Sequence, residues 1–130
     1  MHASRDSLPA ETMGDSYEGH FADWGEFTGY FEKIKGGTDF SPLFVGLPDD
    51  NCQSPHWGYL FKGKIRFIYK DHDEVISAGE AYYAPPGHKI ECLEMLRRWS
   101  FLLRRISRKR SRLRPRTWKR NSVDDVRRGT

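Results

Sequence analysis

The sequence has little cysteine and no long apolar run. Only 2 of its 130 residues are cysteines, which is too few for the disulfide framework of a small secreted domain. No stretch approaches the roughly 20 apolar residues that cross a bilayer, and the N-terminal residues lack the basic start and apolar core of a secretory signal. We therefore expect a cytoplasmic protein with reduced thiols at Cys52 and Cys92, with one disulfide between them as the alternative.

Each part of the chain has too little charge of one sign to balance the other. Residues 1–96 hold 8 Lys and Arg against 16 Asp and Glu, whereas residues 97–130 hold 14 against 2. The net charge of +4 therefore describes neither part. A length of 130 residues is enough for one domain with one core.

Residues 96–130 are expected to form a basic, Arg-rich tail. Its first part, residues 97–114, has the spacing of a basic amphipathic helix, and the chain beyond Pro115 has the composition of a disordered segment. The apolar stripe of the helix consists of Trp99, Leu102, Leu103 and Ile106. Three interpretations of the tail are open: it binds nucleic acid or an anionic membrane surface, it is a solvated extension without a partner, or it is the product of a shifted reading frame. The last follows from the change of composition, which is usually uniform within one domain.

The middle of the chain consists of short segments that alternate in polarity and end at turn residues. Ile65, Phe67 and Tyr69 share one face of such a segment, which is the period of a strand. Gly and Pro interrupt the chain every few residues. Strands are predicted over residues 27–34, 42–45, 59–61, 65–70, 75–76 and 81–84. Closely spaced strands of this kind predict a small antiparallel sandwich or barrel.

Two glycine motifs make this region resemble the cupin family. Gly79, five residues, Pro85, one residue and Gly87 are similar to the core of the second cupin motif. In the first motif a glutamate is followed by six residues and a glycine, and here His56 stands at that distance before Gly63. The three glycines are expected at turns, because glycine adopts the backbone conformations that turns require.

The resemblance implies a fold class and a division of the chain. The fold is all-β: a single antiparallel cupin-type β-barrel, also described as a jelly roll or double-stranded β-helix, over residues 25–95. Residues 1–24 contain few apolar residues and no periodicity, so we expect a flexible N-terminal segment there. Residues 96–130 are the tail described above.

The ligand set departs from the cupin pattern. His56 stands where the family has glutamate, the two histidines that usually precede that glutamate are missing, and Cys52 is the nearest residue there that can bind a metal. The histidine of the second motif falls at Ile90, whereas His88 directly follows Gly87. A thiolate with two imidazoles suits Zn²⁺, and less exclusively copper or iron. Cys52, His56 and His88 are therefore the candidate metal ligands, with zinc as the expected cofactor; no catalytic residue is assigned.

Each candidate ligand also has a purely structural interpretation. Cys52 is then a small buried apolar residue, His56 forms hydrogen bonds inside the barrel, and His88 caps its loop. Because His88 and Ile90 have the same strand parity, we expect His88 at the rim of the pocket and not at its centre.

Aromatic residues divide between the two faces of the predicted strands. Tyr82 and Tyr83 point to opposite faces, so one of the two is expected to line the pocket beside Ile90. An inward His56 turns a set of three aromatic residues outward, namely Trp57, Tyr59 and Phe61. An exposed aromatic face is an interaction surface unless the chain itself covers it, and cupin-like domains often pair through such a face. We therefore expect a homodimer.

Two classes of function are open at this point. In the first, the chain binds a metal ion and a small organic ligand in the barrel pocket, with or without metal-dependent catalysis. In the second, it is a metal-free barrel that binds or senses a small molecule without catalysis. The complete His and Glu set of the dioxygenases in the family is absent. No helix-turn-helix pattern accompanies the barrel, so a nucleic-acid role would depend on the tail alone.

Overall fold

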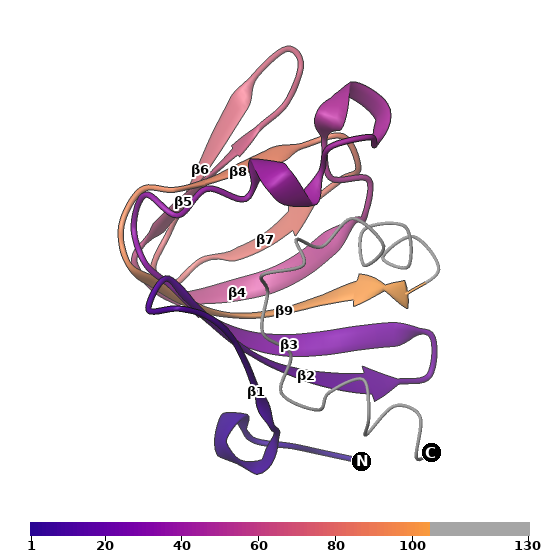
Figure 1. Ribbon diagram of the computed structural model, residues 1–130, viewed down its shortest axis with the longest axis vertical. Coiled ribbons are helices and arrows are strands. Elements are labelled where there is room, and N and C mark those ends of the chain that lie inside the picture. Colours follow the sequence, from indigo (N-terminus) through magenta and orange to yellow (C-terminus); the bar gives the residue numbers. More distant parts are fainter. Residues whose placement is uncertain (105–130) are drawn as a thin grey trace.

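Two antiparallel sheets face each other across a buried core in the computed structural model of the chain, which describes residues 1–104 (Figure 1). The strands of this part are β1 (Ala10–Met13), β2 (Tyr17–Trp24), β3 (Phe27–Ile34), β4 (His56–Lys62), β5 (Lys64–Ile68), β6 (Asp73–Ser77), β7 (Ala81–Ala84), β8 (Lys89–Cys92) and β9 (Leu96–Leu103). Short 3-10 helices lie at η1 (Arg5–Ser7), η2 (Ser41–Leu43) and η3 (Pro48–Asp50). None of the helices within residues 1–104 has the length and apolar character needed to cross a membrane.

The larger sheet has the strand order β1-β2-β3-β9-β4-β7, and the smaller one has the order β6-β5-β8. Strand β9, the last in the described chain, lies between β3 and β4. It pairs Leu103 with Phe27 on one side and Leu102 with His56 on the other. The all-β prediction is therefore confirmed, and the predicted strands at 27–34 and 81–84 coincide with β3 and β7.

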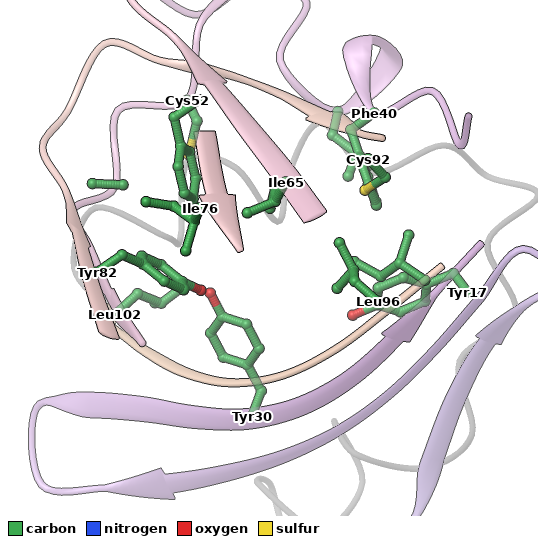
Figure 2. Close-up of a cluster of buried hydrophobic side chains, with 14 of the residues drawn as sticks. Tyr17, Tyr30, Phe40, Cys52, Ile65, Ile76, Tyr82, Cys92, Leu96 and Leu102 are labelled. Carbon is green, nitrogen blue, oxygen red and sulfur yellow. The ribbon is translucent and has the colours of Figure 1, made fainter. Parts of the chain in front are cut away.

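Apolar side chains on the inner faces of both sheets fill the space between them (Figure 2). From the smaller sheet, Ile65 and Phe67 are buried and Tyr69 packs against the same cluster, as their alternation predicts. The larger sheet contributes Leu60 and Tyr30, both buried. Each such side chain stabilises the fold by about 1.5–3 kcal/mol relative to an exposed one.

The prediction of a strand over residues 42–45 is wrong. Residues Ser41–Leu43 form η2 instead, and Phe44 donates its N–H to the carbonyl of Ser41 at 3.1 Å. Pro42 has no N–H to give to a neighbouring strand and is well suited to the first turn of a helix. An isolated short apolar run next to proline therefore took a turn conformation.

The N-terminal segment is not a flexible lead-in over residues 1–24. It contains β1 and β2, and β2 pairs with β3 along its whole length. The side chains of Tyr17 and Phe21 are buried in the core. Two inward aromatic rings and a continuous ladder of main-chain hydrogen bonds hold this segment, although its overall apolar content is low.

The larger sheet also extends past residue 95, because residues 96–103 of the expected basic tail form strand β9 and not a helix. Leu96, Arg98, Ser100 and Leu102 are buried, which is the alternation of a strand. The helical interpretation followed the spacing of the apolar side chains and missed that a polar and a charged side chain also point inward. Residues 105–130, with the rest of the predicted tail, lie outside the described part of the chain.

The inward arginine of β9 is paired. Nη2 of Arg98 lies 2.7 Å from Oε1 of Glu32, and both side chains are buried. Nη1 of Arg98 donates to the hydroxyl of Tyr82 at 3.3 Å. Burial is the largest single influence on this group and opposes its charge. The interactions with Glu32, Tyr82, Tyr30 and Cys92 together outweigh burial and raise the pKa of Arg98 well above its ordinary value. A buried charge is tolerated in this way only when a partner of opposite sign lies beside it.

The glycines of the two motifs lie at turns, as predicted. Gly63, Gly79 and Gly87 have φ values of +87°, +90° and +91°, which side chains with a Cβ adopt at a cost. Their surroundings differ. A Cβ at Gly63 would collide with the main-chain oxygen of Met95 and lie 2.9 Å from Cα of Leu96, whereas a Cβ at Gly79 would meet nothing within 4 Å.

This difference predicts unequal effects of two alanine substitutions. Gly63→Ala and Gly79→Ala should each lower the free energy of unfolding by about 1–2 kcal/mol through backbone strain. Gly63→Ala should lower it by about 1–3 kcal/mol more, because it also forces the β9 main chain aside. Urea unfolding of both variants measures the difference. Equal losses would contradict the close approach of β9 to Gly63.

Candidate metal centre

Main-chain hydrogen bonds join Cys52 to the segment before β8. Cys52 donates its N–H to the carbonyl of His88 at 2.8 Å, and its own carbonyl accepts from Gly87 at 2.8 Å and from His88 at 3.3 Å. The contact is an isolated bridge outside the named strands. It places the side chains of Cys52 and His88 next to the start of β4, where His56 points inward.

The three predicted ligands come together in the core. Sγ of Cys52 lies 3.3 Å from Nε2 of His56, and the ring centroids of His56 and His88 are 5.2 Å apart. One ligand atom from each residue can be chosen so that all three lie within 4.8 Å of one another. All three residues are buried, with exposed fractions of 0% for Cys52, 1% for His56 and 0% for His88.

A second hydrogen bond orients each imidazole. Nδ1 of His88 lies 2.7 Å from the carbonyl of Pro85. A carbonyl only accepts, so Nδ1 carries the proton and Nε2 is the lone-pair nitrogen of the neutral ring. Nδ1 of His56 lies 2.7 Å from the hydroxyl of Tyr30. A hydrogen bond at the second nitrogen is the usual arrangement of a histidine that binds a metal.

The donor set and its spacing fit zinc. In a tetrahedral site with Zn–S near 2.3 Å and Zn–N near 2.0 Å, ligand atoms are about 3.5 Å apart. The distance of 3.3 Å between Cys52 and His56 matches this value. His88 reaches it with a small displacement, since the ligand atoms already lie within 4.8 Å. Three protein ligands leave a fourth position for water or another small molecule.

Strand parity predicted that His88 lies at the rim of the pocket, and this prediction is wrong. Its side chain is buried, and its ring lies between His56 and Phe67, with a centroid distance of 5.3 Å to the latter. The alternation continues into β8, since His88 is buried, Lys89 is exposed and the next residue again faces inward. Parity therefore gives the face on which His88 lies but not its depth. Ile90 itself is half-buried and packs against the core.

Of the two tyrosines expected near the pocket, only Tyr82 points into the core. It is buried, and its hydroxyl donates to Oγ of Ser100 at 3.2 Å. Tyr83 is 49% exposed and stacks on Trp57 on the outer face, with ring centroids 5.1 Å apart. Tyr83 therefore does not line the interior.

The aromatic residues predicted to point outward lie on that same outer face. Tyr59 is 39% exposed and Phe61 is 57% exposed. Trp57 is half-buried, because it also stacks on Phe101 with ring centroids 5.5 Å apart. The homodimer expected from this surface stays a prediction.

Both cysteines are free and buried, so the disulfide alternative is not formed. Cys52 belongs to the ligand cluster, whereas Cys92 lies at the opposite end of the core, beside Phe40 (Figure 2). Burial raises the pKa of the Cys92 thiol to about 11. Cys92 therefore keeps its proton at neutral pH and behaves as a small apolar residue.

A hollow of about 300 Å³ lies on the surface next to the cluster. It is lined by Asp49, Asn51, Ile68, Tyr69, Lys70 and Lys89. The ring of Tyr69, which lines the hollow, has a centroid 6.0 Å from that of His88 in an edge-to-face contact. The ring of His72 stacks on Tyr69, with centroids 4.7 Å apart. Burial, followed by the charge of Glu74, raises the pKa of Tyr69 to about 12, so its hydroxyl is neutral at physiological pH.

Sequence reasoning missed Tyr30 and Tyr69 as neighbours of the site. Tyr30 was placed on a strand, but nothing in its local sequence indicates that its hydroxyl meets His56, which is 26 residues away. The strand pairing of β3, β9 and β4 brings the two together.

No family model and no curated protein matches the sequence. Solved structures do resemble the chain. An RmlC-like cupin from Shewanella frigidimarina is 12% identical with a TM-score of 0.57, over 78% of this chain and 87% of that one. KdgF from a Halomonas species is 17% identical with a TM-score of 0.55, over 79% and 94%. The iron(II) form of HppE is 10% identical with a TM-score of 0.56, over 79% and 60%. Together with the two facing antiparallel sheets, these similarities show that the chain has the cupin fold.

Proposed function

We propose that the chain binds a zinc ion through Cys52, His56 and His88 and receives a small organic ligand beside it. The observation that carries the proposal is the convergence of three buried ligand-type side chains within 4.8 Å of one another. They come from two segments that are far apart in the sequence: Cys52 and His56, just before and at the start of β4, and His88 just before β8.

The chemistry of the set supports zinc over hard cations. Magnesium and calcium prefer oxygen ligands, whereas a thiolate with two imidazoles is a common zinc set. The fold accommodates a metal in at least one similar structure, which is an iron(II) form. Here the glutamate and the extra histidines of the usual cupin site are absent, and a thiolate stands among the donors. Bound zinc would supply a Lewis acid with one open position.

The hollow beside Tyr69 is where we place the organic ligand. It is the surface cavity that adjoins His88, and its volume of about 300 Å³ suits a small molecule. Lys70 and Lys89 on its wall favour an anionic group, and Asp49 adds an acceptor. Tyr69 both lines the hollow and contacts the ring of His88, so we propose that it controls access to the cluster.

Removal of the central ligand tests the metal site. The full-length protein purified without chelator should retain close to one zinc per chain, and His56→Ala should lose it. His72→Ala is the control, because His72 is a surface histidine bonded to Asp71. Elemental analysis measures both. Metal-free wild-type protein that also fails to take up added zinc would refute the metal site and leave the metal-free binding barrel in its place.

Cobalt substitution tests the thiolate. Cobalt(II) bound to a cysteine gives an intense sulfur-to-metal charge-transfer absorption, and we expect this band in the cobalt-loaded protein. Cys52→Ser should abolish the band, whereas Cys92→Ser should leave it unchanged, because Cys92 lies outside the cluster. A band that survives Cys52→Ser would exclude Cys52 as a ligand.

Truncation of Tyr69 tests the route of access. Tyr69→Ala opens the hollow toward His88, so a chelator should remove zinc several-fold faster than from the wild-type protein. The matched control is Tyr59→Ala, which removes a tyrosine from the outer face of the larger sheet. The rate of zinc release is followed with an excess of a chelator that changes colour when it binds zinc. Equal rates for Tyr69→Ala and the wild type would place the route elsewhere.

A further inference from the structure

Tyr30 contacts the candidate centre from the larger sheet. Its hydroxyl lies 2.7 Å from Nδ1 of His56, while Nε2 of the same ring lies 3.3 Å from Sγ of Cys52. The two nitrogens of His56 therefore face in different directions, one toward the other ligands and one toward Tyr30. Tyr30 itself is 1% exposed, so bulk water does not compete for its hydroxyl.

The ring of Tyr30 is held on more than one side. Phe21 packs against it with ring centroids 5.6 Å apart, and Cζ of Arg98 lies 5.8 Å from its centroid. The ring of His56 meets it edge to face at 6.3 Å. A side chain packed in this way presents its hydroxyl at a defined position, so little freedom is lost when His56 binds a metal.

The two histidines of the cluster are oriented by different kinds of partner. His88 is held by the main-chain carbonyl of Pro85, which accepts only and therefore fixes the proton on Nδ1. His56 is held by a hydroxyl, which both donates and accepts. The main-chain carbonyl of Pro85 thus sets the tautomer of His88, whereas the tautomer of His56 is linked to the hydroxyl of Tyr30.

We infer that Tyr30 is a positioning residue of the metal centre: its hydroxyl accepts a hydrogen bond from the Nδ1–H of His56 and so directs the Nε2 lone pair at the metal. The inference rests on the proposed function. On binding, the thiol of Cys52 releases its proton to solvent and His56 keeps a single proton, on Nδ1. No redox change takes place.

The variant that tests this inference is Tyr30→Phe, which keeps the packed ring and removes only the hydroxyl. Zinc affinity, measured by competition with an indicator, should fall about 10- to 100-fold, as it does when the outer partner of a metal-bound histidine is removed. The matched control is Tyr17→Phe. Tyr17 is also buried and its hydroxyl is bonded to Glu32, but it lies at the other end of the core (Figure 2). Its zinc affinity should stay within about twofold of the wild type.

A spectroscopic measurement on the wild-type protein separates positioning from stability. With ¹⁵N-labelled histidine and zinc bound, Nδ1 of His56 should carry a slowly exchanging proton with a cross-peak to the ring of Tyr30. Absence of that proton overturns the inference even if Tyr30→Phe does not fold. Equal zinc affinity of Tyr30→Phe and the wild type also overturns it, and leaves the metal site itself standing. A wild-type protein that binds no zinc removes the proposed function and this inference together.

Discussion

The main-chain bonds between Cys52 and the Gly87–His88 segment are the constraint on which the candidate site depends. Three N–H groups and two carbonyls take part in them, and each such bond contributes on the order of 1 kcal/mol. Gly87 has a φ of +91° there, which residues with a Cβ adopt at a cost. Together with a hydrogen bond from Nδ2 of Asn51 to the carbonyl of Gly87, the bridge holds the loop before β4 against the loop before β8. With it, a thiol and an imidazole from distant segments are buried side by side.

The fold was largely predictable where the chain follows a simple alternation. Gly and Pro mark the turns of the central region, and the strands predicted at 65–70 and 81–84 lie close to β5 and β7. The predictions at 59–61 and 75–76 cover only parts of β4 and β6, and β8 was not predicted. The structure of residues 1–24 and 96–104, at the two ends, was predicted wrongly. Around Arg98 the inward side chains include a charged residue, and its partner Glu32 lies on another strand. No local pattern distinguishes a paired inward arginine from a solvated one, because the pairing arises from tertiary structure.

The three candidate ligands could be predicted because motif spacing, and not local polarity, identified them. His56 was located by its distance to Gly63, and His88 by its place after Gly87. The depth of His88 could not be predicted, since strand parity gives only the face of the sheet, and the bridge to Cys52 is a tertiary contact. The contact of Tyr30 with His56 could not be predicted from the sequence either. It results from the register of three strands that are far apart in the sequence.

The position of β9 has a consequence for the order of events on the ribosome. The larger sheet is divided into β1-β2-β3 and β4-β7 until β9 is inserted between them, and β9 is the last strand in the described chain to be synthesised. Until that moment β3 and β4 both expose an unpaired edge, the feature that nascent sheets must protect from other chains. Closing the gap also joins Phe27 to Leu103, at nearly opposite ends of the domain, which makes the final step entropically costly and slow. A nascent chain of this architecture therefore keeps two open sheet edges until β9 leaves the exit tunnel.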